Sequence, residues 1–158
     1  MREDLEKRVD KAVELFMQGY NCSQAVTAAF ADLYGLDTEM ALRVSAGFGG
    51  GVGRLRMMCG AVSGMVLLAG LAEGQTEGDD RKGKTECYKS VRSLLDRFKE
   101  ENSSVICAEL LALAGAKTDG SHIPSERNAE YYKKRPCAEY VGDACEILEN
   151  YLTEKGLM

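Results

Sequence analysis

The 158-residue sequence contains a single histidine and no tryptophan. Catalysis of the Ser-His-Asp or Cys-His type needs a histidine as general base, and only His122 is available for that role. His122 lies in the polar segment 119–122, where we expect a solvated loop side chain. The acidic residues show no paired spacing, and the Glu-x-x-His metal motif is absent. The sequence therefore disfavours acid–base chemistry.

An excess of basic residues is also missing. The chain has 20 Lys and Arg residues against 25 Asp and Glu residues, which gives a net charge of −5. These charges are spread along the chain and form no basic stripe of the kind that duplex-binding surfaces carry. Nucleic acid is therefore not an expected partner.

Signals for secretion or membrane insertion are not found. Residues 1–8 alternate in charge and lack the apolar stretch and the small-residue cleavage site of a secretory signal. The longest uncharged run, residues 57–72, has 16 residues, and a helix that spans a bilayer needs roughly 18 or more. We expect a cytoplasmic protein without membrane insertion, in which residues 57–72 form a buried central helix.

Nucleotide-binding motifs are absent as well. The glycine-rich segment 47–53 does not contain the Gly-x-Gly-x-x-Gly of dinucleotide-binding folds or the Gly-Lys-Ser/Thr that ends a P-loop. We expect this segment to form a bend with close backbone approach and to turn its N–H groups toward the thiolate of Cys59. No nucleotide cofactor is predicted.

Helical periodicity, in contrast, is present along the chain. Leu5, Val9, Val13 and Phe16 recur at the spacing of one helix face, and no segment shows the period-two alternation of a strand. The expected helices, by caps and periodicity, span about residues 5–18, 22–34, 37–44, 55–72, 105–114, 125–134 and 136–152. A further helix, marked by the apolar face of Tyr88, Val91, Leu95 and Phe98, ends near residue 101. These patterns predict one all-α domain over residues 1–158, an irregular bundle of about 6–8 helices around the central apolar helix.

With acid–base and nucleotide-binding motifs absent, cysteine is the residue type that remains as a candidate for the chemistry of this protein. In a cytoplasmic protein of this length, six cysteines are expected to be thiols, metal ligands or catalytic groups and not a disulfide scaffold. The Cys-x-x-Cys spacing of thioredoxin-type dithiols and zinc ribbons is absent. Any site must therefore be assembled from distant parts of the chain.

Four of the cysteines lie near predicted helix starts. Cys22, Cys107 and Cys137 open predicted helices, and Cys59 lies near the start of the central helix if that helix begins around Leu55. The free N–H groups and the positive dipole end of a helix favour a thiolate, so we expect lowered pKa values for these thiols. The positive charges of Arg54 and Arg56 would add to this effect near Cys59.

A structural role is the alternative for each cysteine. Cys87 and Cys145 fall within predicted helices, where we expect them to fill the core as small hydrophobic residues. The same interpretation stays open for the other four, because cysteine is among the residue types most often buried.

Four short segments around these cysteines have a distinctive order. They are Tyr20-Asn21-Cys22-Ser23-Gln24-Ala25, then Cys59-Gly60-Ala61-Val62-Ser63-Gly64, then Cys107-Ala108-Glu109-Leu110-Leu111, and finally Cys137 followed by Tyr140-Val141. In this order they resemble the C_GCAxxG_C_C family, whose members are described as redox-active proteins of about this length, and the resemblance covers nearly the whole chain. The central segment begins Cys-Gly-Ala where the family label has Gly-Cys-Ala, a form that the family also uses.

The resemblance implies that Cys22, Cys59, Cys107 and Cys137 act together as one thiolate site. They would serve as catalytic residues, as cofactor ligands or as metal ligands. Four thiolates are also the number that holds a [2Fe–2S] or [4Fe–4S] cluster. A similar domain occurs in split-Soret cytochromes, where an iron–sulfur cluster has been proposed, but this chain has no Cys-x-x-Cys-His. Covalent haem is therefore not expected.

The leading hypothesis is a redox-active protein that uses either an iron–sulfur or other metal cluster or reversible disulfide chemistry, with an electron-transfer or redox partner. One alternative is a structural four-cysteine zinc site in a helical interaction module. Another alternative is a helical adaptor that has only buried structural thiols. Such an adaptor could form a homodimer through the Tyr131–Tyr132 surface or through the central helix. The order of the segments predicts that the four sulfur atoms converge in the folded chain.

Overall fold

The computed structural model describes residues 2–158, with side chains from residue 7 onward. Leu5, expected on the inner face of the first helix, therefore lies outside the described side chains. The elements are Arg2–Met17 (α1), Cys22–Phe30 (α2), Ala31–Tyr34 (η1), Thr38–Ser45 (α3), Ala46–Phe48 (η2), Gly60–Glu73 (α4), Arg81–Asn102 (α5), Cys107–Leu113 (α6), Ala129–Lys134 (α7) and Cys137–Glu154 (α8).

The predicted all-α fold is confirmed. Eight α-helices and two short 3-10 helices make up the regular structure of residues 2–158, and β pairing there is limited to an isolated antiparallel bridge between Met58 and Ile106. None of the helices in this part of the chain combines the length and the apolar character that crossing a membrane requires.

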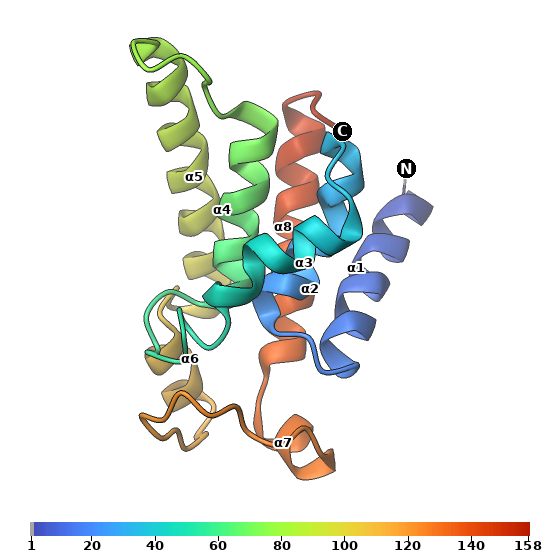
Figure 1. The fold of residues 1–158 in the computed structure, drawn as a ribbon, viewed down its shortest axis with the longest axis vertical. Coiled ribbons are helices and arrows are strands. Elements are labelled where there is room, and N and C mark those ends of the chain that lie inside the picture. The colour runs from blue at the N-terminus through green and yellow to red at the C-terminus, as the bar shows by residue number, and fades with distance from the viewer. Residues whose placement is uncertain (1) are drawn as a thin grey trace.

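The helices form a bundle around α4, as expected for the central apolar helix. Helix α4 packs against α2, α5 and α8, and α1 lies against α2 and α8. In Figure 1 these five helices run roughly along the long axis of the molecule, while α3 crosses in front of them. The short helices α6 and α7 and their connecting segments lie together at the lower end.

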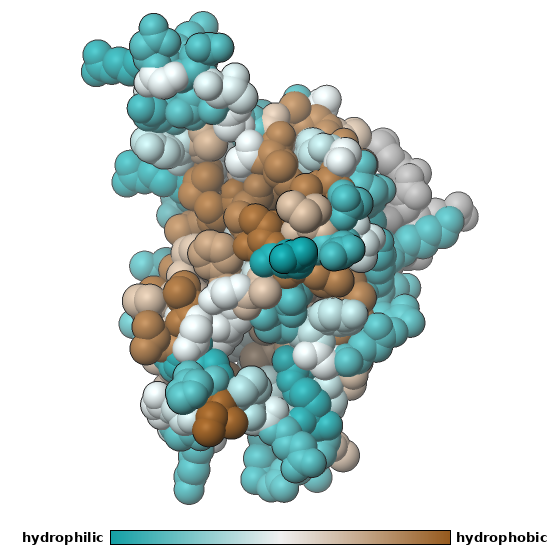
Figure 2. Space-filling view, viewed as in Figure 1, coloured by the Kyte–Doolittle hydropathy of each residue, from teal (hydrophilic) through white to brown (hydrophobic). Residues whose placement is uncertain are grey.

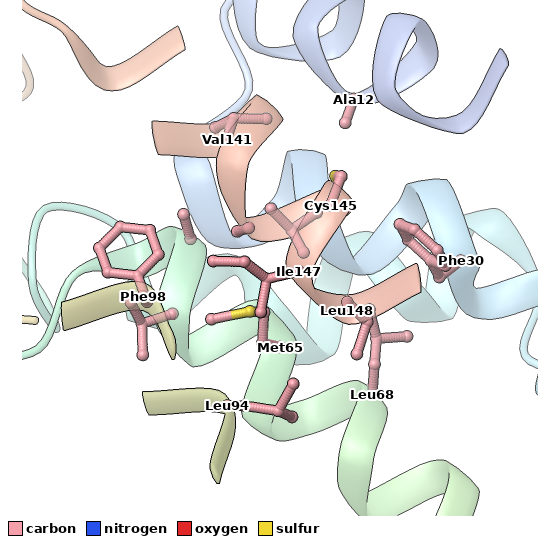
Figure 3. Packing of buried hydrophobic residues seen from close by; sticks show 14 of the residues in the cluster. Ala12, Phe30, Met65, Leu68, Leu94, Phe98, Val141, Cys145, Ile147 and Leu148 are labelled. Atoms are coloured by element: carbon pink, nitrogen blue, oxygen red, sulfur yellow. The ribbon is translucent and has the colours of Figure 1, made fainter. Parts of the chain in front are cut away.

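The core is made of apolar side chains from the five long helices. Met65 and Leu68 of α4 meet Leu94 and Phe98 of α5 and Leu148 of α8 in one cluster, and all five are fully buried (Figure 3). Burying side chains of this size stabilises the fold by about 1.5–3 kcal/mol each. The core fixes the helix axes, and with them the positions of the helix starts.

Small residues bring α2 and α4 close together. A Cβ atom at Gly64 would lie 2.8 Å from Cβ of Val26, and one at Gly60 would lie 3.1 Å from Cβ of Cys22. The expectation that these two glycines allow another helix to pack tightly is confirmed, with α2 as that helix. The close packing places Cys22 next to the start of α4.

Some helix boundaries agree with the sequence prediction and others do not. The capping box of Asn21 and Gln24 is present at the start of α2. Helix α4 begins at Gly60 and not near Leu55, because the residues before it adopt left-handed turns. Helix α5, Arg81–Asn102, ends close to the expected residue 101, and the Asp80 side chain caps its start by accepting from the N–H of Gly83.

Candidate functional site

The structure brings Cys22, Cys59, Cys107 and Cys137 together around one small cavity. Three of them are the first residues of helices, namely of α2, α6 and α8, and Cys59 is the N-cap residue of α4. Four helix starts from distant parts of the sequence therefore converge on one place. The cavity lies at the end of the bundle where α6 and α7 are located (Figure 1).

Cys59 is held by the start of its own helix. The backbone N–H groups of Ala61 and Val62, in the first turn of α4, lower the pKa of its thiol, and its own N–H donates to the carbonyl of Val105 at 2.8 Å. Segment 47–53 also reaches this place, because Gly50 and Gly51 line the same cavity as Cys59. The N–H groups at the end of the segment bond to carbonyls within the loop, as between Gly53 and Gly47 at 2.9 Å.

This glycine-rich loop instead positions Cys107. Its backbone is left-handed at many positions, including the non-glycine residues Val52, Arg54 and Arg56, with φ between 61° and 69°. Such φ values are unfavourable for residues with a Cβ atom, above all for a β-branched one. The turn leaves the carbonyl of Met57 free to accept from the N–H of Cys107 at 2.6 Å, which fixes the first residue of α6.

Cys22 and Cys137 form a hydrogen-bonded pair of thiols. The S–H of Cys22 donates to the sulfur of Cys137, and this bond, together with burial, holds the pKa of Cys22 well above its usual range. The same bond, with the nearby guanidinium groups of Arg135, Arg127 and Arg56, lowers the pKa of Cys137. Cys137 is therefore the thiol of this site that most readily becomes a thiolate.

The other two thiols behave differently because they are desolvated. Burial raises the pKa of Cys59 to about 12, against the backbone N–H groups of Val62 and Ala61, which lower it. Burial also raises the pKa of Cys107, although Arg56 Nη1 donates to its sulfur at 3.7 Å. A lowered pKa, as predicted for all four thiols, is thus found for Cys137 alone, where the hydrogen bond from Cys22 and the arginines are its causes. At Cys22 the hydrogen bond to Cys137 and burial raise the pKa, and at Cys59 and Cys107 burial raises it.

Thiol reactivity in metal-free protein is expected to follow this order. Because a thiolate is the reactive form, Cys137 should be alkylated at a lower pH than a free cysteine, whereas Cys22, Cys59 and Cys107, whose pKa values are raised, should react later. Brief iodoacetamide treatment over a range of pH, read by peptide mass spectrometry, measures the order. Half-buried Cys87 is first replaced by alanine so that it does not compete for the reagent. Faster alkylation of Cys59 or Cys107 than of Cys137 would contradict this assignment.

Arginine side chains surround the thiols. Arg56, Arg127 and Arg135 line the cavity, whereas no Asp or Glu is among its lining residues. Arg127 donates to the carbonyls of Phe16 and Tyr20, so it ties the segment before α7 to the end of α1. Sequence reasoning noticed Arg56 but missed Arg127 and Arg135, because no motif or spacing marks them in the polar stretch before α8.

The remaining sequence candidates lie away from the thiols. Cys145 is fully buried in the core, as expected, and Cys87 is only half-buried on α5 and is not part of the core cluster. The expectation that Cys87 fills the core is therefore wrong. Cys87 shares a helix face with the buried residues Leu94 and Phe98, but it lies near the start of α5, and the N-terminal turns of this helix extend beyond α4 (Figure 1). His122 is exposed in its loop, as expected.

A single metal ion needs thiolate ligands at about 2.3 Å from one point. Among the described residues, no three His, Cys, Asp or Glu side chains are arranged as such a site. The four cysteines surround a cavity instead of meeting at one point. Their roles as catalytic residues, cofactor ligands or metal ligands stay predictions.

Comparison with known proteins agrees with the arrangement of the cysteines. A family model described as "Putative redox-active protein (C_GCAxxG_C_C)" matches residues 20–151, a range that contains all four. An uncharacterized protein of Archaeoglobus fulgidus is 24% identical over 156 residues, which cover 97% of this chain and 98% of that protein. No solved structure matches the chain. The chain belongs to the C_GCAxxG_C_C family.

Proposed function

We propose that Cys22, Cys59, Cys107 and Cys137 form one electron-transfer site that holds an iron–sulfur cluster. The observation that carries the proposal is the convergence of four helix starts, each with one cysteine, on a single cavity. Cys₄ ligation is the usual way to hold [2Fe–2S] and [4Fe–4S] clusters. Ligands from facing helices are also a common way to build such a site in a helical bundle.

The chemistry of the cavity lining fits such a group. Thiolates that bind iron carry negative charge, and the three lining arginines supply compensating positive charge. Gly60 has no Cβ atom, and one at this position would lie 3.1 Å from Cβ of Cys22. The backbone of α4 can therefore approach the thiols closely. An iron–sulfur cluster held there would accept and release one electron at a time.

The surroundings of the sulfur atoms would tune this exchange. The backbone N–H groups of Ala61 and Val62 at the start of α4 favour a negative charge on Cys59, and Arg56 Nη1 donates to Cys107 at 3.7 Å. Hydrogen bonds and positive charge at ligand sulfurs favour the reduced, more negative state and raise the reduction potential. These residues would therefore set the potential without binding the metal themselves.

A second candidate function is reversible disulfide formation between Cys22 and Cys137, which the hydrogen bond between the two thiols favours. The Cys137 thiolate would attack a disulfide of a partner, and the released partner thiolate would take up a proton. Cys22 would then give up its proton and attack the mixed disulfide, which leaves the Cys22–Cys137 disulfide and a second reduced thiol on the partner. The two electrons pass from this protein to the partner.

Redox titration of protein purified without oxygen separates these functions. An iron–sulfur site predicts visible charge-transfer bands that bleach with dithionite and return on reoxidation. Colourless protein in which Cys22 and Cys137 become protected from alkylation only after oxidation supports the disulfide function. Colourless protein that contains zinc and whose thiols do not respond to oxidants would overturn both.

A further inference from the structure

A second cavity opens beside the thiol cavity. It has a volume of about 290 Å³, and its lining shares Arg56, Arg127, Arg135 and Tyr131 with the thiol cavity. Figure 2 shows a hollow in the lower half of the molecule, between the polar loops and the helical body. A small molecule in this second cavity would therefore lie next to the cysteines.

The lining of this cavity is strongly basic in a chain of net charge −5. Arg54 joins the three shared arginines, and no Asp or Glu is among the lining residues. Of the four arginines, Arg54 forms an ion pair with a carboxylate, that of Asp119, which lies 3.3 Å from Arg54 Nη1. Because guanidinium groups stay protonated at any physiological pH, the cavity keeps its positive potential.

Two of the arginines are already occupied by structural contacts. Arg54 donates to the carbonyls of Ser121 and Ile123, and Arg127 donates to those of Phe16 and Tyr20. These contacts hold the loop 119–125 and the segment before α7 in place. They make Arg54 and Arg127 parts of the cavity wall.

Arg56 still has donors to offer. Its Nη1 donates to Cys107, whereas Nε and Nη2 are shielded from solvent and have no hydrogen-bond partner among the described residues. Buried donors without a partner are rare in folded proteins and costly, more so on a charged group. The Nε and Nη2 edge of a guanidinium carries two parallel N–H groups, which fit two oxygen atoms of one anion.

We propose that the arginine-lined cavity binds a small anion with two equivalent oxygens, of the phosphate, sulfate or carboxylate type, through the free edge of Arg56. Arg135, which makes a single hydrogen bond to the carbonyl of Lys117 at 3.3 Å, is the second contact residue. Because the two cavities share these arginines, the bound anion would lie beside the thiol site, and any influence on its redox chemistry rests on the proposed redox function.

Titration of the purified protein with sodium sulfate, with chloride adjusted to hold the ionic strength constant, tests the site. Binding is followed by amide shifts in ¹H–¹⁵N NMR spectra or by calorimetry. Arg56→Lys keeps the charge but removes the two-pronged edge, and should weaken binding by about tenfold or more. Arg135→Gln should weaken it severalfold. Arg97→Gln is the matched control, because Arg97 pairs with Glu154 away from the cavity.

The outcomes separate this inference from the proposed function. The site is supported if sulfate binding is saturable, is weakened by Arg56→Lys and Arg135→Gln, and is unchanged by Arg97→Gln. The same binding is expected in Cys22→Ser protein, which holds no cluster. Protein that carries a cluster but binds no sulfate overturns the inference and leaves the redox function intact. If the Arg56→Lys variant does not fold, the Arg135→Gln variant provides the test. Sulfate binding that is as strong in Arg135→Gln protein as in the unmodified protein also overturns the inference.

Discussion

Replacement of any one of Cys22, Cys59, Cys107 or Cys137 by serine is expected to abolish the reversible visible absorbance of the protein. Each residue supplies one of four thiolates from a different helix, and no other cysteine lines the cavity that could replace it. When one of the four thiolate ligands is removed, an iron atom of the cluster becomes exposed to solvent and can dissociate. Absorbance spectra and iron content of anaerobically purified variants measure the effect, and circular dichroism checks that each variant is folded.

The two other cysteines provide matched controls. Cys145→Ala removes a buried sulfur from the core and should cost about 1 kcal/mol of stability, whereas Cys87→Ala changes a half-buried position on α5. Neither residue lines the cavity, so both variants should keep full iron content and absorbance. Full absorbance in two or more of the four serine variants would be incompatible with a shared four-thiolate site.

Gly51→Ala is expected to have the second largest effect, because Gly51 is enclosed by backbone. Its φ is 75°, and a Cβ atom there would lie 2.6 Å from the N atom of Met57 and 2.7 Å from Cα of Arg56. Backbone cannot move aside as a flexible side chain can, so we expect a loss of about 1–3 kcal/mol from overpacking and about 1–2 kcal/mol from the left-handed conformation. Chemical denaturation measures the free energy of unfolding.

The same substitution should also disturb the site. The carbonyl of Met57 holds the N–H of Cys107, so a shift of Met57 moves the first residue of α6 and should reduce cluster content. Gly53→Ala is the control: Gly53 has a φ of 56°, but no atom lies within 4 Å of a Cβ there. It should cost only the left-handed strain of about 1–2 kcal/mol. Equal stability and cluster content in both variants would show that the loop does not position Cys107 by this contact.

Sequence patterns predicted the fold class because helical periodicity and caps are local. The Asn21–Gln24 capping box and the small residues Gly60 and Gly64 each specify a contact that the sequence alone can indicate. The start of α4 was missed because it depends on the left-handed turn at residues 50–56, which propensities of single residues do not describe. At the start of α6, Ile106 occupies the N-cap position without a capping side chain, and Ser104 donates to Glu109, a contact that no local pattern indicates.

The cysteines of the site were predictable, but their electrostatics were not. The order of the cysteine segments in the chain resembles that of a family, and capping residues in the sequence indicated where several helices begin. The pKa values depend on burial, on the contact between Cys22 and Cys137, and on Arg127 and Arg135. These are contacts between segments that are far apart in sequence, so no local pattern reports them. The basic cavity beside the thiols was missed for the same reason.

Iron and acid-labile sulfide content of the protein purified without oxygen tests the central claim most directly. A cluster held by Cys22, Cys59, Cys107 and Cys137 predicts iron and sulfide in equal amounts, about two or four of each per chain, in protein reconstituted to completion. Zinc content is measured in the same samples. Protein that contains neither iron nor sulfide after anaerobic reconstitution, while the four thiols remain reduced and accessible to alkylation, would contradict the claim.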